Sequence, residues 1–124
     1  MSQLLAIALG GAVGSVARFG VSNAVYWLLG RDFPWGTLAV NLLGSFLMGL
    51  LFVLLLERLS WGPEWRGALL VGFLGAFTTF STFSIETLNL LEDGALLAAF
   101  INMVLSVWLC VLVCWVGIIL GRSL

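Results

Sequence analysis

Long apolar stretches make up most of the chain, and three clusters of charged and turn-forming residues interrupt them, at residues 30–34, 57–64 and 92–94. An α-helix needs roughly 20 apolar residues to cross about 30 Å of hydrocarbon. Each stretch between the clusters reaches that length. The pattern therefore predicts four membrane-spanning helices, at about residues 3–29, 36–56, 66–91 and 95–121.

Nothing remains for a soluble domain or a linker once these spans are drawn, so we expect residues 1–124 to form a single all-α transmembrane domain. Strands of a membrane β-barrel are about ten residues long and alternate between apolar and polar positions, and these segments do neither. Aromatic side chains typical of membrane interfaces flank the expected boundaries, at Tyr26, Trp27, Trp35, Trp61 and Trp65.

Composition supports this interpretation and excludes several functions. Of the 124 residues, 62% are hydrophobic and 9% charged, and the mean hydropathy is +1.19, whereas soluble domains are about 45–50% apolar and about 25% charged. The chain has no histidine and only two cysteines, which argues against histidine-based catalysis and a zinc site. It has no lysine and a net charge of −1, so it offers no basic patch for nucleic acid. We expect an integral membrane protein that is not an enzyme.

The charges outside the spans bias the orientation only weakly. With four spans, both termini and the middle loop share one side of the membrane, which carries Arg58, Arg66 and Arg122. The other side carries Arg31, and Arg18 lies inside the first span. The positive-inside rule favours cytoplasmic termini by a thin margin. This margin fits a short protein with few loop charges, and it also fits a chain that inserts in both orientations. Because four short helices enclose little volume, we expect function to need an oligomer.

The third span contains an unusual polar run. Five hydroxyl side chains and two phenylalanines fall within residues 78–84, close to the middle of the span. Gly72 and Gly75 precede the run and permit unwinding, so we predict that the third helix is broken around residues 75–79. Carbonyl groups freed by a break in lipid need other partners, and small cations fill this role in several transporters. The alternative is a continuous helix whose hydroxyls bond to its own carbonyls.

Phe80 and Phe83 are three residues apart and project from one side of the third helix. They could face lipid or pack in the core. However, the edge of an aromatic ring carries positive partial charge, so ring edges beside hydroxyl donors could also solvate a small anion without a full positive charge.

Four further polar residues lie at similar depth, in the half of the membrane nearer the first loop: Arg18, Thr37, Asn41 and Glu86. Arg18 and Glu86 could form an ion pair that ties two helices together. They could also line a vestibule that attracts anions. The two interpretations are compatible.

The fourth span has a mildly polar stripe with a spacing of four residues, Asn102, Ser106, Cys110 and Cys114. Small polar residues of this kind also serve as ordinary helix contacts, and we interpret the cysteines as small packing residues. Small residues repeat every four positions elsewhere too, which predicts close helix packing, at Ala6, Gly10 and Gly14 and at Ala68, Gly72 and Ala76.

Three stretches carry a resemblance to a known family: GGAVGSVAR at residues 10–18, GTLAVNLLGSF at residues 36–46 and GFLGAFTTFSTFSIE at residues 72–86. In length, number of spans and order of motifs, the whole chain resembles the Fluc/CrcB fluoride channels. The resemblance implies an antiparallel, dual-topology homodimer with two pores in the inner membrane of a bacterium. Such a channel lets fluoride leave the cytoplasm passively and so reduces its toxicity.

The resemblance also implies roles for individual residues. Phe80 and Phe83 match an aromatic box in the pore, and Asn41 matches an asparagine that donates to the passing anion. Hydroxyl groups line a polar track, for which Thr82 and Ser106 are the best matches. The full set assigned to anion binding is Phe80, Phe83, Asn41, Thr82, Ser81, Ser106, Asn102 and Thr37.

Charged groups and a cation complete the implied site. Arg18 matches the arginine of the vestibule, and Glu86 matches the acid that follows the third motif. The resemblance further implies a structural Na⁺ on the dimer axis, held by backbone carbonyls at the broken third helix and not transported. Gly75 and Thr78 are the matching positions.

Two other functions compete with this one. A small multidrug exporter would also have four short helices, but it needs an embedded carboxylate to exchange protons with cationic drugs, and the first span carries Arg18 instead. A nonconducting packing subunit would not need five hydroxyls in the middle of a span.

Overall fold

The computed structural model describes residues 2–124, all of whose regular elements are helical. The labels η mark π-helical turns, which the sequence periodicity does not predict. The elements are α1 (Ser2–Leu29), α2 (Trp35–Phe52), η1 (Val53–Arg58), α3 (Pro63–Arg66), η2 (Gly67–Leu74), α4 (Gly75–Phe77), α5 (Phe80–Glu92) and α6 (Leu96–Ser123).

These elements combine into four segments that are long and apolar enough to cross a membrane: Ser2–Leu29, Trp35–Arg58, Pro63–Glu92 and Leu96–Ser123. Their bounds agree with the predicted spans to within three residues. The prediction of an all-helical protein with four spans is confirmed.

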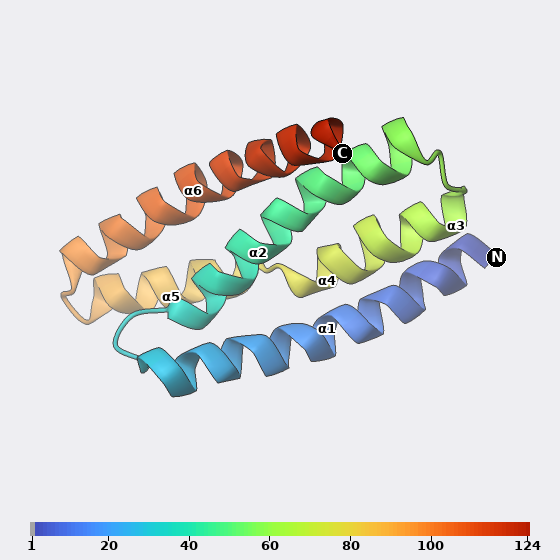
Figure 1. The fold of residues 1–124 in the computed structure, drawn as a ribbon. Coiled ribbons are helices and arrows are strands. Elements are labelled where there is room, and N and C mark those ends of the chain that lie inside the picture. Colours follow the sequence, from blue (N-terminus) through green and yellow to red (C-terminus); the bar gives the residue numbers. More distant parts are fainter. Residues whose placement is uncertain (1) are drawn as a thin grey trace.

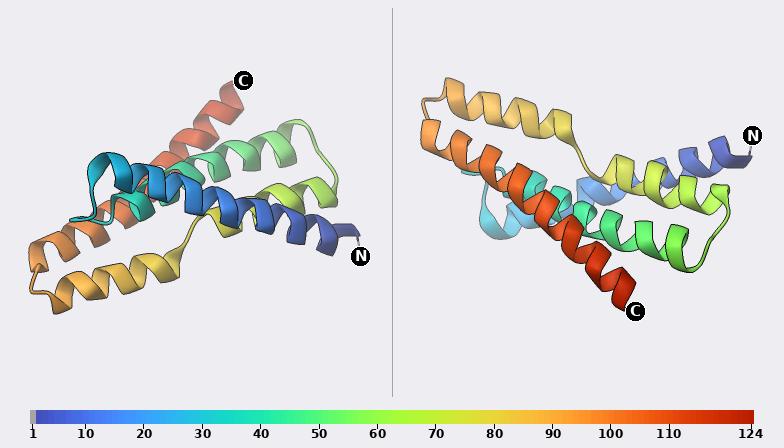
Figure 2. Two further views of the ribbon diagram at one scale, coloured as in Figure 1. Left: turned by 90° about the horizontal axis from the view of Figure 1, so that it is seen from below. Right: turned by 90° about the horizontal axis from the view of Figure 1, so that it is seen from above.

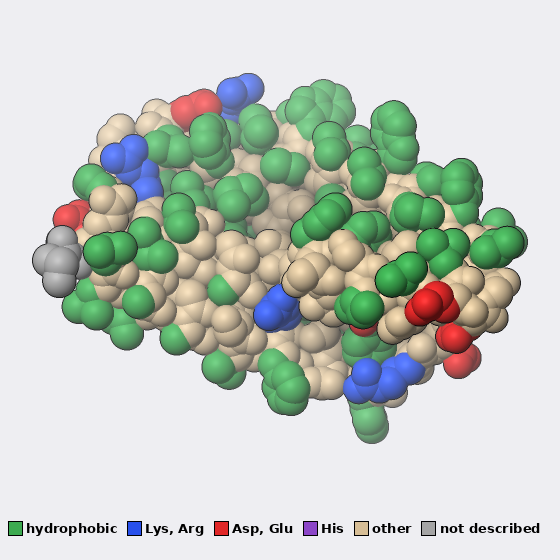
Figure 3. All heavy atoms as spheres, turned by 180° about the vertical axis from the view of Figure 1, so that it is seen from behind, with side chains coloured by type: hydrophobic (Ala, Val, Ile, Leu, Met, Phe, Trp, Pro, Cys, Tyr) green, Lys and Arg blue, Asp and Glu red, His purple; other side chains and the backbone are tan. Residues whose placement is uncertain are grey.

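The spans run back and forth along one long axis (Figure 1). Both termini and the connection between η1 and α3 lie at one end of the molecule, and the α1–α2 and α5–α6 loops lie at the other. Seen from behind (Figure 3), apolar side chains cover much of the length, and charged side chains gather at the two ends. Basic atoms also lie near the middle of this face. The distribution is that of a protein whose middle lies in hydrocarbon.

Close approach of backbones holds the spans in pairs. A Cβ atom added at Gly10 or Gly14 of α1 would collide with the backbone of η2, and one added at Gly72 would collide with the backbone of α1. The predicted packing role of these glycines is therefore confirmed. A second contact, between α2 and α6, depends in the same way on Gly49 and Gly117, which the sequence analysis did not single out. Small residues at such crossings let helices associate where lipid removes the hydrophobic driving force.

The third span is not regular throughout. Helix α4 ends at Phe77, and the next two residues have extended backbone angles: φ −90° and ψ 160° at Thr78, and φ −152° and ψ 117° at Thr79. Helix α5 then begins at Phe80. Figure 2 shows this link as an uncoiled stretch near the middle of the molecule. The Thr78 N–H still donates to Leu74 O over 3.1 Å, whereas the N–H groups that follow lack the partners that a regular helix would give them.

The packing of α1 on η2 can be tested with a single methyl group. Gly14→Ala places a Cβ against the Phe73 carbonyl, whereas the space around Gly20 on the same helix is open. Alanine has the higher helix propensity, so Gly20→Ala should be neutral or stabilising. Overpacking at Gly14 should cost about 1–3 kcal/mol of stability. Thermal unfolding of the two purified variants measures the difference, and equal melting temperatures would contradict the packing argument.

Candidate ion-binding site

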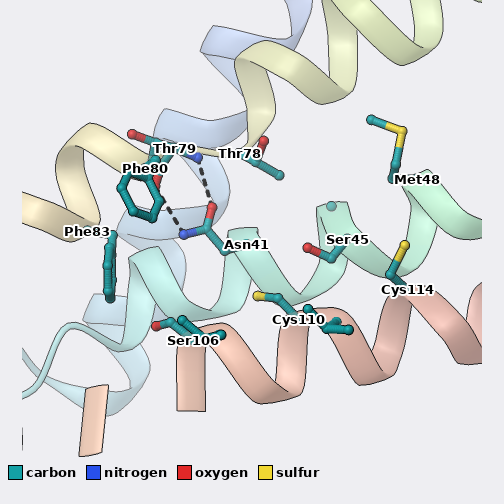
Figure 4. Close-up of a pocket in the computed structure, with 13 residues that line it drawn as sticks. Asn41, Ser45, Met48, Thr78, Thr79, Phe80, Phe83, Ser106, Cys110 and Cys114 are labelled. Carbon is teal, nitrogen blue, oxygen red and sulfur yellow. Dashed lines mark hydrogen bonds between the residues drawn. The ribbon is translucent and has the colours of Figure 1, made fainter. Parts of the chain in front are cut away.

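A pocket of about 370 Å³ lies beside the interruption, between α2, α5 and α6. Five of the predicted site residues line it together: Asn41, Thr78, Phe80, Phe83 and Ser106. They come from three separate spans and converge near the middle of the membrane segment (Figure 4). The structure thus joins the polar run of the third span to the polar stripe of the fourth.

The two phenylalanine rings are neighbours, but their environments differ. Their centroids are 5.3 Å apart and the ring planes are inclined by 43°. Phe83 is 8% exposed, whereas Phe80 is 76% exposed. Phe80 therefore forms a rim of the pocket that is open to the outside of the single subunit.

Asn41 makes two hydrogen bonds to the interruption, drawn as dashed lines in Figure 4. The Thr79 N–H donates to Asn41 Oδ1 over 2.8 Å, and Asn41 Nδ2 donates to the Thr79 carbonyl over 3.1 Å. The sequence analysis expected this amide to donate to an anion. In the structure, the side-chain oxygen and one N–H of this amide are hydrogen-bonded to the backbone of Thr79.

The hydroxyl groups after the interruption organise the start of α5. Thr79 is the N-cap residue, and its Oγ1 accepts from the Thr82 N–H over 3.1 Å. The same hydroxyl donates to Thr82 Oγ1 over 3.0 Å and lies 3.5 Å from Ser81 Oγ. Thr82 and Ser81 are therefore linked to the cap, and they do not line the first pocket.

A second cavity, of about 320 Å³, lies on the α1 side of the interruption. Arg18 lines it, together with Thr37 and Thr82, and Thr79 lines both cavities. The predicted vestibule arginine is thus separated from the Phe80–Phe83 pair by the backbone of the interruption. Thr37 is buried, and its hydroxyl lies 3.4 Å from the Tyr26 hydroxyl.

Glu86 does not pair with Arg18, so the proposed ion pair between them is wrong. The Tyr26 hydroxyl donates to Glu86 Oε2 over 2.9 Å, and the Tyr26 oxygen also lies 3.4 Å from the Thr37 hydroxyl. The Arg31 guanidinium stacks over the Tyr26 ring at 4.5 Å. Sequence analysis treated Tyr26 only as a boundary aromatic. Tyr26 lies eight residues, or about 2.2 helical turns, after Arg18, so it is turned by about 80° around α1 and lies nearer the α1–α2 loop.

An ion pair does occur at the opposite end of the molecule, where Arg122 and Glu57 approach to 3.2 Å. It is the only one within residues 2–124 and is well exposed. Ion pairs therefore do not set the arrangement of the site.

Asn102 lies in the α5–α6 contact and does not line the pocket. It is 2% exposed, and its Nδ2 donates to Thr87 Oγ1 over 2.9 Å. Ser106 donates to Asn102 Oδ1 over 3.4 Å. Asn102 thus ties α6 to α5 and orients Ser106, which does face the pocket.

Ser45, Cys110 and Cys114 were not among the predicted site residues, although all of them line the pocket. Both cysteines have free thiols. We interpreted them as packing residues, although their spacing of four from Ser106 already put them on the face that lines the pocket.

The interruption leaves the carbonyls of residues 75–78 without their helical partners, and for two of them a replacement bond of the N–H group can be named. In a continuous α-helix, the Thr79 N–H would donate to Gly75 O and the Thr82 N–H to Thr78 O. Here these N–H groups donate to Asn41 Oδ1 and Thr79 Oγ1 instead. Backbone carbonyls are suitable ligands for a hard cation. Within residues 2–124, no cluster of three acidic or cysteine side chains offers an alternative metal site. The chain therefore fits a cation that backbone oxygens hold at Gly75 and Thr78.

The fold and the site define a class: a multi-pass helical membrane protein with a cavity on each side of an interrupted span, each lined in part by polar side chains. A family model described as "CrcB-like protein, Camphor Resistance (CrcB)" matches residues 5–118, and the chain belongs to this family.

Curated relatives support the assignment along the whole chain. The chain is 60% identical over 122 residues to a "Fluoride-specific ion channel FluC" of Methylococcus capsulatus, a match that covers 98% of this chain and 54% of that protein. It is 59% identical over 120 residues to the protein of that name in Magnetococcus marinus, covering 97% and 98% of the two chains. The Geobacter sulfurreducens protein of that name is 52% identical over 124 residues, with both chains fully covered. This chain is accordingly a multi-pass bacterial membrane protein and not an enzyme.

The capping role of Thr79 gives a prediction that needs no transport assay. Thr79→Val removes the oxygen that accepts from Thr82 and should lower stability by about 1 kcal/mol. Thr79→Ser retains that oxygen and should stay close to the parent. Thermal unfolding of the three proteins measures both effects. The cap would have no energetic role if the valine variant unfolded at the temperature of the serine variant.

Proposed function

We propose that this chain is the subunit of a fluoride channel. The observation that carries the proposal is the pocket in which an amide, a hydroxyl and two phenylalanine rings meet beside an interrupted helix, from Asn41, Ser106, Phe80 and Phe83. The names of its curated relatives support the same substrate.

The pocket chemistry suits a small anion that must both bind and leave. Fluoride is strongly hydrated, so close donors must compensate for the water it loses. Amide, hydroxyl and ring-edge contacts are individually weak, and conduction requires binding that is weak enough for release. A lysine or arginine in the pocket would hold the anion, and the pocket lining contains neither.

Arg18 supports an anion rather than a cation as the transported species. It lines the neighbouring cavity, where its positive charge raises the local concentration of anions. A multidrug exporter would need an acidic group in this span. The Arg18 side chain has the opposite charge.

Fluoride leaves the cytoplasm through this channel without energy coupling. Hydrogen fluoride crosses membranes as a neutral acid and dissociates in the less acidic cytoplasm. The trapped anion then leaves through the inner membrane, driven by its gradient and the membrane potential. Passive efflux lowers the toxic internal concentration.

The functional unit in this proposal is an antiparallel homodimer with two pores, inserted in both orientations. Several groups that are costly in lipid face outward from the single subunit near mid-span: Gly75, Ser81 and Ser84 are exposed beside Phe80. Polar groups at this depth need protein or water as partners. A second copy would cover them, and the weak charge bias between the two membrane faces permits both orientations.

A structural Na⁺ completes the proposed dimer. Gly75 is exposed and Thr78 is half-buried at the edge of the same region, so a second subunit could bring an equivalent pair of carbonyls to the same ion. The cation offsets the cost of unpaired carbonyls in a low-dielectric setting. It is held and does not permeate.

Fluoride efflux from liposomes that contain the purified protein tests the substrate. The parent should release fluoride, while chloride and proton-coupled cation transport stay at background. Phe80→Ile and Phe83→Ile keep apolar bulk but remove the ring quadrupole, so each should reduce fluoride flux by about tenfold or more. Phe100→Ile removes an exposed ring on α6, outside the pocket, and serves as the matched control.

Two outcomes would contradict this proposal. Proton-coupled cation transport without fluoride flux would favour an exporter. Parent-like flux in both pocket variants would mean that the rings only pack and that the anion takes another path.

Accessibility of engineered cysteines tests the two orientations. Ser2→Cys and Asp32→Cys would be made separately in a background that lacks Cys110 and Cys114. The two sites lie at opposite ends of the first span. A thiol reagent that does not cross membranes should label part of each population from outside the cell and the rest only after lysis. Labelling of one site entirely from outside and the other only after lysis would rule out dual insertion.

A further inference from the structure

We propose that Asn41 is a positioning residue for the interruption: it holds the Thr79 N–H and thereby keeps the Gly75 carbonyl free. The amide that lines the anion pocket would then also maintain the cation site. The link to a cation rests on the proposed function, whereas the support of the backbone rests on the hydrogen bonds alone.

Two acceptors, Gly75 O and Asn41 Oδ1, compete for the Thr79 N–H. In a continuous helix the Thr79 N–H would donate to Gly75 O, but here it donates to Asn41 Oδ1 over 2.8 Å. Because Thr79 is extended, its N–H and carbonyl point to the same side and exchange both bonds with one partner, as paired residues do in an antiparallel sheet. The second bond, from Asn41 Nδ2 over 3.1 Å, fixes the orientation of the amide.

Thr79 is 8% exposed, so water cannot readily replace Asn41 as the acceptor for its N–H. Without the amide, this N–H either stays unpaired, which is costly in a buried site, or returns to Gly75 O and extends the helix. The first result lowers the stability of the folded protein, and the second takes the Gly75 carbonyl away from a cation.

Helix α2 contacts both residues of the interruption. Gly44 lies one turn after Asn41, and a Cβ atom added there would collide with the methyl group of Thr78. Thr78 therefore rests on Gly44 while Thr79 pairs with Asn41. One face of α2 fixes the two residues whose backbone is extended.

The same Asn41 side chain that supports the interruption also belongs to the pocket. Asn41 lines the pocket with Phe80 and Phe83, as Figure 4 shows. Within residues 2–124, its second N–H has no recorded protein partner, and it remains available to a ligand. A change at the Gly75 and Thr78 carbonyls would shift Thr79 and hence the amide. Such coupling is reciprocal between the two sites.

Thermal unfolding of the purified full-length protein tests this inference, with NaCl titrated against choline chloride. Asn41→Ala removes both hydrogen bonds without adding bulk, and Asn41→Leu removes them at similar volume. Asn23→Ala is the matched control, because Asn23 also makes two hydrogen bonds, to the Phe19 carbonyl and from Arg31, but within and beside a regular helix.

The parent and the Asn23 variant should be stabilised by Na⁺ with similar midpoints. The Asn41 variants should unfold at lower temperature and need about tenfold more Na⁺, or show no response, as expected for coupling of 1–3 kcal/mol. If only one Asn41 variant folds, the Na⁺ concentration at the midpoint of its stabilisation tests the inference. If neither folds while the Asn23 variant does, the requirement for Asn41 in the backbone arrangement is supported.

Parent-like unfolding and an unchanged Na⁺ midpoint in a folded Asn41 variant would overturn the inference. A parent protein indifferent to Na⁺ would overturn the link to a cation site. Neither readout uses fluoride transport, so a protein that shows the expected Na⁺ response but no fluoride flux would contradict the channel proposal alone.

Discussion

Backbone hydrogen bonding in hydrocarbon is the constraint on which the rest of this structure depends. Every N–H and carbonyl at membrane depth needs a partner, and a regular helix supplies them all. The extended residues Thr78 and Thr79 interrupt the helical hydrogen bonds, and side chains provide other partners. Asn41 pairs with the Thr79 backbone, and Thr79 Oγ1 accepts from the Thr82 N–H. The carbonyls of residues 75–78, those of Gly75 and Thr78 among them, remain without a helical partner. A local departure from helix geometry thereby exposes backbone oxygens of the kind that the proposed cation would need.

The replacement works only because the neighbouring spans are held at fixed positions. Gly10 and Gly14 set α1 against η2, and Gly49 and Gly117 set α2 against α6. These contacts join backbone to backbone, so they leave little room for one span to slide along another. Asn41 and Thr79 therefore meet at hydrogen-bonding distance although 38 residues separate them. The hydrogen bonds between Asn41 and Thr79 therefore depend on the close packing of the spans at small residues.

Hydropathy and length were enough to predict the four spans, because a membrane imposes one thickness on every crossing. The run of hydroxyls after Gly75 pointed to the position of the extended residues, since such side chains compete with helical hydrogen bonds. The choice of partner could not be predicted. Depth alone put Glu86 level with Arg18, but only the rotation of α1 decides that Tyr26 reaches it. Ser106 lines the pocket, whereas Asn102, one turn earlier on the same side of α6, contacts α5, because the two residues lie at different heights along the helix.

The charges and the weak donors occupy different places, and this separation bears on how a small anion could pass. The positive charge of Arg18 lies across the interruption from the phenylalanine pair, and Glu86 is covered by the hydroxyl of Tyr26. In the proposed channel, an anion would therefore be attracted near the pocket but would meet only neutral groups within it. Full charges act over several ångströms and raise local concentration, whereas neutral donors act at contact and release their ligand. With Arg18 beside Phe80, the full charge would act at the same place as the neutral donors, and an anion would bind there too tightly to be released. The backbone of Thr78 and Thr79 keeps Arg18 and Phe80 apart.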